Sequence, residues 1–222
     1  MKKRAASEAA EWVESHMIVG LGTGSTVFHF IEKLIERCKN GLQIQAVSSS
    51  NNSSKQAEEG GIPLLDINTI TTIDMTFDGA DEIDPKKRMI KGGGGALLRE
   101  KILADSSREM VVIVDETKIV DYLGQKAKLP LEILPFAYLA TEQKIKKLGY
   151  AGEFRKTTNH LLYTTDNGNL IFDITLDDSR KNPEEDQSRL IQIPGVLETG
   201  FFFNLAGRVI IGLSDGNIKV LP

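Results

Sequence analysis

Two hydrophobic periods alternate along the first half of the chain. A short apolar run at residues 17–21 predicts a buried strand. Apolar side chains then recur every three or four positions over residues 27–38, as on one face of an amphipathic helix. The alternation predicts further helices over 4–15, over 52–59 and after residue 95, and further strands near 42–47, 62–65, 73–77 and 110–114. Strands that alternate with helices form βαβ crossovers, so we expect an α/β fold with a mostly parallel sheet.

The pattern changes after residue 124 and predicts a smaller α+β unit. Its predicted elements are a strand over 129–134, a helix over 137–148, strands near 153–158, 161–164 and 169–175, and a helix that ends before Pro194. Residues 208–213 and 217–221 predict a hairpin that returns to the first sheet. We therefore expect a discontinuous first domain of residues 1–127 and 201–222, and an inserted domain of residues 128–200.

Composition and charge narrow the class of protein. The net charge is -4 and neither half of the chain has a basic surplus, which argues against nucleic-acid binding. No apolar run approaches the ~18 residues that a membrane span needs, and acidic residues interrupt any signal-peptide core. Cys38, the single cysteine, falls on an apolar helix face, and the three histidines are widely spaced. We expect a soluble, cytoplasmic protein without a disulfide, a structural zinc site or a membrane partner.

A glycine-rich segment, Gly22–Thr26, lies between the first predicted strand and its helix. Glycines allow a tight turn, and the N–H groups of a helix N-terminus favour an anion. A Walker lysine is missing, Ser25 stands where a dinucleotide fingerprint needs its third glycine, and three serines, Ser48–Ser50, replace a ribose-binding acid. A single phosphate is therefore the better ligand, and a glycine turn with a Ser/Thr cap is the alternative.

Four acidic residues fall within seven positions, Asp78–Asp84, after a predicted strand. Their spacing does not fit a calcium loop, because position 12 of such a loop would be Met89. A magnesium site stays open. Otherwise the spacing suits carboxylates that bind the hydroxyls of a polyol from one loop, and an exposed acidic turn is the plainer interpretation.

The most informative segment is Lys91–Gly95, four glycines after a lysine, followed by a helix. Backbone N–H groups at a helix N-terminus can stabilise a developing oxyanion, and Lys91 adds positive charge. Glu100 has only apolar residues three and four positions away, so desolvation should raise its pKa toward that of a general base. A solvated surface glutamate is the alternative. Lys118 follows the end of another predicted strand. For the basic segment Lys2–Arg4 two interpretations stay open, pairing with a phosphate or a frayed terminus.

Together these motifs resemble the type A ribose-5-phosphate isomerases. In chain order they are GLGTGST, SSS, DGADE, KGGGGALLREK and VDETK, with PGVLETGFFF and IIGLSDG near the end. The resemblance implies that the first domain is Rossmann-like and catalytic, and that the inserted domain, residues 128–200, is ferredoxin-like and contacts another subunit. It implies a homo-oligomer, either a dimer or a tetramer. It also implies interconversion of D-ribose 5-phosphate and D-ribulose 5-phosphate, without a metal or cofactor, in the non-oxidative pentose phosphate pathway.

The resemblance assigns roles residue by residue. Glu100 would be the general base, Asp81 would aid ring opening and Lys91 would stabilise the enediolate. The substrate-binding residues that it implies are Thr23, Gly24, Ser25, Thr26, Asp78, Gly79, Ala80, Asp81, Lys91, Gly92, Gly93, Gly94 and Lys118.

This sequence departs from the family pattern at a few positions. Gly95 stands where members often carry alanine, Phe202 follows Phe201 where Gly-Leu-Phe is common, and the link around residues 176–183 looks variable. Three alternatives compete: a sugar-phosphate sensor of the same fold, an amino-sugar-phosphate deaminase and a nucleotide-dependent oxidoreductase. The sensor is the strongest, but only about 16 residues precede the first strand, too few for a helix-turn-helix unit.

Overall fold

The chain divides into two compact units in a computed structural model that describes residues 1–176 and 182–222. Unit 1 consists of Met1–Ala80, Arg99–Ile119 and Asn204–Pro222, and unit 2 of Asp81–Leu98 and Val120–Phe203. Most of the link expected to vary around residues 176–183 lies outside the described residues.

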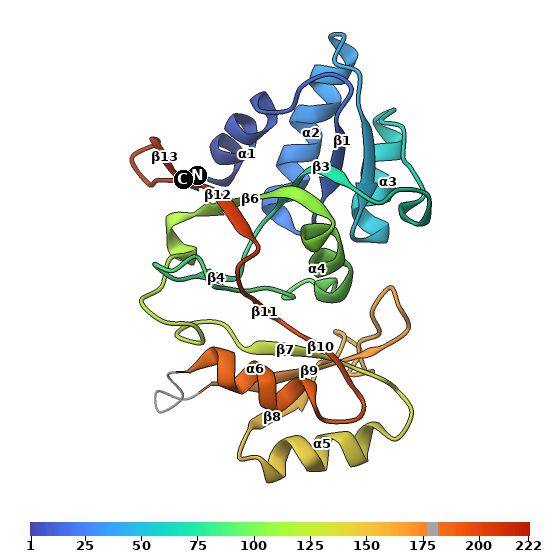
Figure 1. The fold of residues 1–222 in the computed structure, drawn as a ribbon, viewed down its shortest axis with the longest axis vertical. Coiled ribbons are helices and arrows are strands. Elements are labelled where there is room, and N and C mark those ends of the chain that lie inside the picture. Colours follow the sequence, from blue (N-terminus) through green and yellow to red (C-terminus); the bar gives the residue numbers. More distant parts are fainter. Residues whose placement is uncertain (177–181) are drawn as a thin grey trace. The chain divides into compact units, whose positions relative to one another are not determined.

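Unit 1 contains a six-stranded sheet. Its strands, in spatial order, are β13 (Ile218–Leu221), β12 (Ala206–Gly212), β6 (Ser107–Asp115), β3 (Ile73–Asp78), β1 (Ile18–Leu21) and β2 (Gln45–Ser48). All neighbours are parallel except β12 and β13, which form the predicted antiparallel hairpin. Figure 1 shows the red strand β12 beside the green strand β6, so the end of the chain completes the first sheet as expected.

Unit 1 also contains helices, and the first two pack on this sheet through the apolar stripes seen in the sequence. The helices are α1 (Lys2–Glu11), α2 (Ser25–Lys39), α3 (Asn51–Glu59), α4 (Leu97–Asp105) and the short η1 (Ile67–Thr69) and η2 (Glu116–Lys118). The main core contains Val19 and Ala46, and the rings of Phe30 and Phe77 stack there at 4.5 Å. Residues adjacent in a strand face opposite sides of a sheet, so Ala46 and Val47 of β2 belong to different clusters. Leu103 of α4 packs with Val47 in the second cluster.

The strand order places a topological switch point in unit 1. Strand β1 pairs with β2 on one side and with β3 on the other, so the loops that leave β1 and β3 diverge there. In open α/β sheets, ligands bind beyond the carboxyl ends of the strands at such a point. Gly20 lets β1 and β3 pack closely, since a Cβ on it would lie 1.9 Å from Thr76 Oγ1.

Unit 2 has two small antiparallel sheets. The four-stranded one has the order β10 (Val196–Thr199), β7 (Leu129–Ile133), β9 (Leu170–Thr175) and β8 (Ala151–Phe154), and the helices are α5 (Tyr138–Lys147) and α6 (Pro183–Ile191). The three-stranded one has the order β11 (Phe201–Phe202), β5 (Met89–Ile90) and β4 (Glu82–Ile83). These elements form the smaller α+β unit that the second half of the sequence predicts.

The division of the chain differs from the expected boundaries at residues 127–128 and 200–201. Residues 81–98 and 201–203 belong to unit 2, although both were expected in the first domain. The physical reason is strand pairing, because Phe201–Phe202 pairs with Met89–Ile90 and so draws the glycine-rich segment into unit 2. Two-residue strands of this kind carry no periodic signal.

Smaller differences concern element ends. The first helix ends at Glu11 instead of residue 15, and β2 begins at Gln45 instead of residue 42. The strand expected near 62–65 is a single bridge between Ala46 and Leu64.

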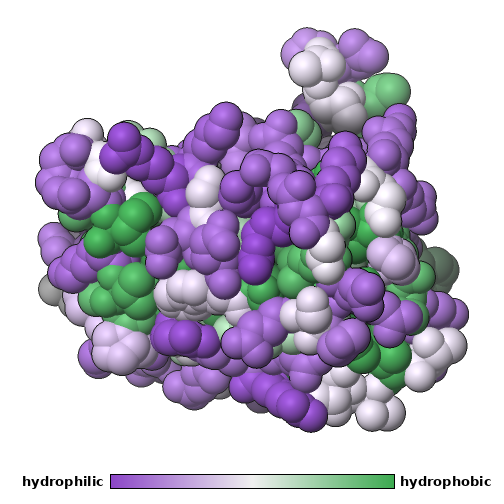
Figure 2. Space-filling model, turned by 90° about the horizontal axis from the view of Figure 1, so that it is seen from above, coloured by the Kyte–Doolittle hydropathy of each residue, from purple (hydrophilic) through white to green (hydrophobic). Residues whose placement is uncertain are grey.

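Polar side chains predominate on the face that Figure 2 shows, and the apolar ones form small separate groups there. Within the described residues, no helix combines the length and apolar character that a membrane crossing requires.

Candidate functional site

The loop after β1 forms the N-terminus of α2 in unit 1, as predicted for an anion site. Gly24 has φ 108°, a conformation that favours glycine, and Ser25 begins the helix. Lys2 Nζ donates a hydrogen bond to Ser25 Oγ at 2.9 Å. The helix dipole, a hydroxyl and an ammonium therefore converge at one point that suits a phosphate.

The serines after β2 form hydrogen bonds that hold this loop in place. Ser50 caps α3, since its side chain accepts from Ser53 N–H, and Ser53 Oγ donates to Gly22 O at 2.7 Å. Thr23 Oγ1 lies 2.8 Å from Ser49 Oγ. The serines thus have structural partners where a dinucleotide-binding protein would place a ribose-binding acid.

Asp78, at the end of β3, is fully buried and joins the two loops at the switch point. Its Oδ1 accepts from Thr23 N–H at 3.2 Å and from Gly79 N–H at 2.7 Å. Gly22 makes this approach feasible, because a Cβ there would lie 2.1 Å from the Asp78 carboxyl carbon. A contact of Asp78 with a substrate hydroxyl stays a prediction.

The acidic segment does not act as one loop of ligands. Glu82 lies on β4 with no exposed surface, and its carboxylate accepts from the backbone N–H groups of Gly124, Lys126 and Ala127. Asp84 is 5 % exposed and pairs with Arg88, whose Nε donates to it at 2.7 Å. The interpretation as an exposed acidic turn is therefore wrong for these two carboxylates, which are buried and hold the backbone of unit 2.

Asp81 is the member of the segment that contacts the glycine loop. In unit 2, Gly93 N–H donates to Asp81 Oδ2 at 2.7 Å. The side chain is partly exposed, as a group that contacts a substrate must be. Its role in ring opening stays a prediction. Among the described residues, no cluster of three or more His, Cys, Asp or Glu side chains could hold a metal ion.

Lys91 and the glycines after it have the geometry of an anion-binding loop. The side chain of Lys91 is 3 % exposed, and its Nζ lies 5.4 Å from the centroid of the Phe202 ring. Gly92 has φ 104°, which favours glycine, whereas Gly93 and Gly94 are exposed. Backbone N–H groups and a lysine can stabilise an oxyanion, and the enediolate-binding role of this loop stays a prediction.

Gly95 has a structural reason to depart from the alanine common in the resembling family. Its φ is 79°, and a Cβ there would lie 2.5 Å from the ring of Tyr163. Tyr163 therefore occupies the space that an alanine methyl would fill. The fourth glycine and this tyrosine are coupled within unit 2.

Glu100 lies in the first turn of α4 and is 3 % exposed, so the alternative of a solvated glutamate is wrong. Burial raises the pKa of a carboxyl, but the first turn of a helix carries a partial positive charge that stabilises a carboxylate. The dipole was not considered in the sequence analysis. Because the two effects oppose each other, the raised pKa of Glu100 stays a prediction.

The other candidate residues have plainer surroundings. Lys118 ends η2 next to Asp115, which is 4 % exposed and whose Oδ1 accepts from Thr117 N–H at 3.0 Å. Cys38 packs against the core, and burial raises its pKa, with Arg37 lowering it less. A cysteine of this kind does not act as a nucleophile.

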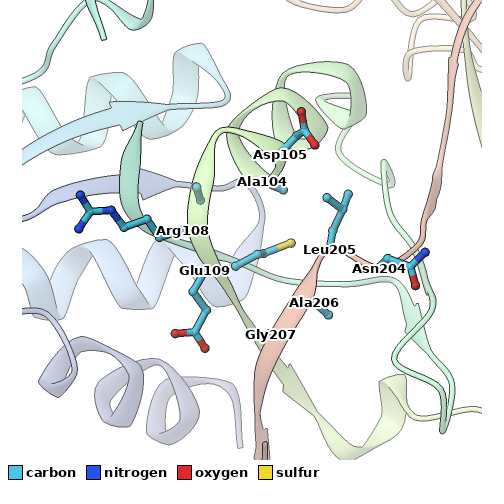
Figure 3. Close-up of a pocket in the computed structure, with 10 residues that line it drawn as sticks. Ala104, Asp105, Arg108, Glu109, Asn204, Leu205, Ala206 and Gly207 are labelled. Carbon is cyan, nitrogen blue, oxygen red and sulfur yellow. The ribbon is translucent and has the colours of Figure 1, made fainter. Parts of the chain in front are cut away.

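A cavity of about 340 Å³ in unit 1 lies away from these loops. Ser107, the first residue of β6, lines it, whereas Asp115 is the last residue of β6 and lies at the other end of that strand. Figure 3 shows Leu205 and Asn204 among the residues that line this cavity, and the Arg108 side chain extending away from them. Two of its charged residues are paired, Arg108 with Asp74 and Glu109 with Arg208. None of the predicted site residues lines it.

The structure thus joins predicted residues inside each unit. Thr23 and Asp78 are linked in unit 1, and Asp81 and Gly93 in unit 2. From the sequence the role of Lys2 stayed open, and no pattern pointed to Arg155 or Tyr163, whose side chains bind the carbonyl groups of the glycine loop. The only sequence signal for Lys2 was its position just before a predicted helix. Arg155 and Tyr163 had no signal in the sequence.

Comparison with known proteins gives consistent matches. Residues 45–216 match the family described as ribose 5-phosphate isomerase A (phosphoriboisomerase A). The chain is 53% identical over 220 residues to ribose-5-phosphate isomerase A of Protochlamydia amoebophila (strain UWE25), an alignment that covers 99% of this chain and 94% of that protein.

Two solved structures match over almost the whole chain. Ribose 5-phosphate isomerase A from Methanocaldococcus jannaschii has a TM-score of 0.93 and 34% identity, with 99% and 97% of the two chains covered. A D-ribose-5-phosphate isomerase in complex with phospho-erythronic acid has a TM-score of 0.92 and 39% identity, with 99% and 96% covered. The resemblance that the motifs predict is confirmed.

Proposed function

The chain belongs to the ribose 5-phosphate isomerase A family and is an aldose–ketose isomerase, and from this premise we propose that Glu100 is its general base. The reaction interconverts D-ribose 5-phosphate and D-ribulose 5-phosphate. The sensor alternative is not favoured, because the matching relatives are named as isomerases.

Ring opening and the transfer of a proton from C2 to C1 define the chemistry that the residues must perform. Asp81 takes the proton of the anomeric hydroxyl and returns it to the ring oxygen as the C1–ring oxygen bond breaks, which opens the furanose and exposes the aldehyde. Glu100 then removes the proton from C2, the electron pair forms the C1–C2 double bond, and negative charge develops on O1. Return of the proton to C1 and transfer of the O2 proton to O1 give the ketose. General bases of this kind contribute about 10²–10⁴-fold to a rate.

The developing negative charge needs a counterpart. Lys91 and the N–H groups of the segment Gly92–Gly94 supply it, since preorganised donors in a buried setting stabilise an oxyanion strongly. Thr23–Thr26 receives the phosphate, Asp78 with Gly79 and Ala80 holds hydroxyls, and Lys118 contacts the sugar. The proposal rests on the burial of two ionisable side chains. Lys91 and Glu100 lie within ten consecutive residues of the sequence, and each is only 3 % exposed.

The test of the function is turnover of the purified, EDTA-treated protein on ribose 5-phosphate, followed by appearance of the ketose. We expect the EDTA-treated enzyme to retain full activity, because carboxylate and lysine groups perform each step. Activity that returns only when Mg²⁺ is added would contradict the metal-free mechanism. Tight binding of ribose 5-phosphate without turnover would instead favour the sensor.

Lys2 extends the proposal to the phosphate site. Its Nζ lies 2.9 Å from Ser25 Oγ at the N-terminus of α2, so its charge adds to the helix dipole. We expect Lys2→Ala to raise KM for ribose 5-phosphate about tenfold, the effect of losing one hydrogen bond to a charged group. The change in kcat should stay within about twofold, because the phosphate is remote from the reacting carbons.

The neighbouring lysine provides the control for Lys2. Lys3 lies on the same helix and is exposed, so Lys3→Ala removes the same charge without the contact to Ser25. We expect an unchanged KM for this variant at 0.15 M salt, where charges about 8 Å or more apart are screened. Equal effects of the two substitutions would show that only net charge matters and would contradict the role of Lys2.

The proposal includes a homo-oligomer and a cytoplasmic location. Exposed apolar side chains of unit 2 support the homo-oligomer. They are Phe136, Leu139 and Leu134, which are 83%, 57% and 40% exposed. Exposed apolar groups of this kind mark interaction surfaces. The strand β10 also forms an edge of the four-stranded sheet that another chain could pair with. A phosphosugar substrate of central metabolism supports the cytoplasmic location.

A further inference from the structure

Two side chains from the segment of unit 2 between β8 and β9 bind the carbonyl groups of the glycine loop. Arg155 Nη1 donates to Gly92 O at 3.0 Å and to Gly93 O at 2.9 Å. Tyr163 OH donates to Gly94 O at 3.0 Å. Three successive carbonyl groups therefore have side-chain donors, in a loop that β-strand or helix hydrogen bonds do not restrain.

Arg155 is itself fixed in place. Asp173 on β9 binds its guanidinium through two hydrogen bonds, Nε to Oδ2 at 2.9 Å and Nη2 to Oδ1 at 2.6 Å. The two side chains are 18% and 12% exposed. A bidentate pair of this kind fixes both position and direction, and the partly buried setting makes it costly to break.

Tyr163 completes the contact. Its ring lies beside the guanidinium, with 5.7 Å from Arg155 Cζ to the ring centroid. Burial raises the pKa of Tyr163, with Arg155 lowering it less, so the hydroxyl keeps the proton that it donates to Gly94 O.

The planar trans peptide links each bound carbonyl to the N–H on its other side. Arg155 thereby sets the direction of the Gly93 and Gly94 N–H groups, and Tyr163 sets that of Gly95. Gly93 N–H donates to Asp81 and Gly95 N–H donates to Gly92 O. Within residues 1–176 and 182–222, Gly94 N–H has no protein acceptor, and Gly94 is exposed.

Resting on the proposed function, we propose that Arg155 is a positioning residue that orients the glycine-loop peptides so that Gly94 N–H donates to the enediolate oxyanion. Glycine peptides rotate easily, so an unrestrained loop would lose this orientation for much of the time. The guanidinium also polarises the two peptides, which strengthens their N–H groups as donors. Tyr163 supports the same arrangement from the next carbonyl.

Arg155→Met and Tyr163→Phe remove the two contacts. We expect kcat to fall about 10²-fold in the first variant, the lower end of the effect of losing an oxyanion donor, and about fivefold in the second. KM for ribose 5-phosphate should change less than threefold. Arg155→Lys should recover part of kcat, since it keeps a charge near the carbonyls but loses the fork that Asp173 binds.

A second measurement separates positioning from a general structural role. Phospho-erythronic acid, which a solved relative binds, carries a planar carboxylate where the enediolate carries its negative charge. We expect Arg155→Met to weaken its inhibition by about the same factor as kcat. Arg208→Met is the matched control, because Arg208 also forms a bidentate pair, with Glu109 in unit 1, and it should change neither value.

The outcomes are distinguishable. Inactive wild-type protein would overturn the proposed function itself. Active wild-type protein with normal kcat and inhibition in Arg155→Met would overturn only the role of Arg155. Equal loss of affinity for ribose 5-phosphate and for phospho-erythronic acid would indicate a structural role and would also overturn it. If Arg155→Met does not fold, unchanged kcat and inhibition in Tyr163→Phe would count against the proposal in the same way.

Discussion

Glu100→Gln is expected to lower kcat by about 10³-fold or more while the protein stays folded. Glutamine has the shape of glutamate but cannot accept the C2 proton, so the variant loses the general base. KM should change little, since the base contacts the substrate only through the proton that it removes. Steady-state kinetics with ribose 5-phosphate, together with the thermal unfolding temperature, would measure both effects.

The control for this substitution is Glu58→Gln. Glu58 lies on α3 and is exposed, so the variant carries the same chemical change on another helix of unit 1. We expect wild-type kcat from it. A folded Glu100→Gln variant with near-normal turnover would remove Glu100 from the mechanism.

Lys91→Met is expected to lower kcat by 10²–10³-fold, the second largest effect. The ammonium is 3 % exposed, and in a buried setting its charge stabilises the developing oxyanion more than it would in water. Methionine keeps most of the volume of the side chain, and its thioether suits the aromatic neighbour Phe202. The variant should therefore fold and bind substrate while it fails to stabilise the transition state.

Lys128→Met is the matched control for Lys91. Lys128 also lies in unit 2, but it is 49% exposed and pairs with Glu153. An exposed pair of this kind contributes little to stability, so kcat should stay unchanged. A loss of activity in Lys91→Met that appears wholly in KM would contradict the oxyanion role and would place Lys91 in ground-state binding.

The sequence predicted the larger sheet well because its elements are long and periodic. The stripe from Val27 to Cys38 defines α2, and the run Met110–Val114 lies inside β6. The two-residue strands escaped prediction, since Met89–Ile90 pairs with Phe201–Phe202 more than a hundred positions away. Such pairing depends on tertiary structure and leaves no local pattern.

The candidate site shows the same limit. Motif order identified the glycine loops and Glu100, but residue type alone could not separate Asp81 from Glu82. The first binds an exposed glycine N–H, and the second accepts three N–H groups in the interior of unit 2. Arg155 was missed because its contacts to the glycine loop arise only when β8, β9 and the segment between them fold.

Exchange of the substrate C2 proton with solvent tests the central claim most directly. Ribose 5-phosphate incubated in D₂O with wild-type enzyme should gain deuterium at C2, and the ketose should gain it at C1, because the proton held by Glu100 can exchange before it returns. Glu100→Gln should bind substrate and catalyse no such exchange. Deuterium incorporation at the wild-type rate by the folded variant would show that another group removes the C2 proton and would contradict the account.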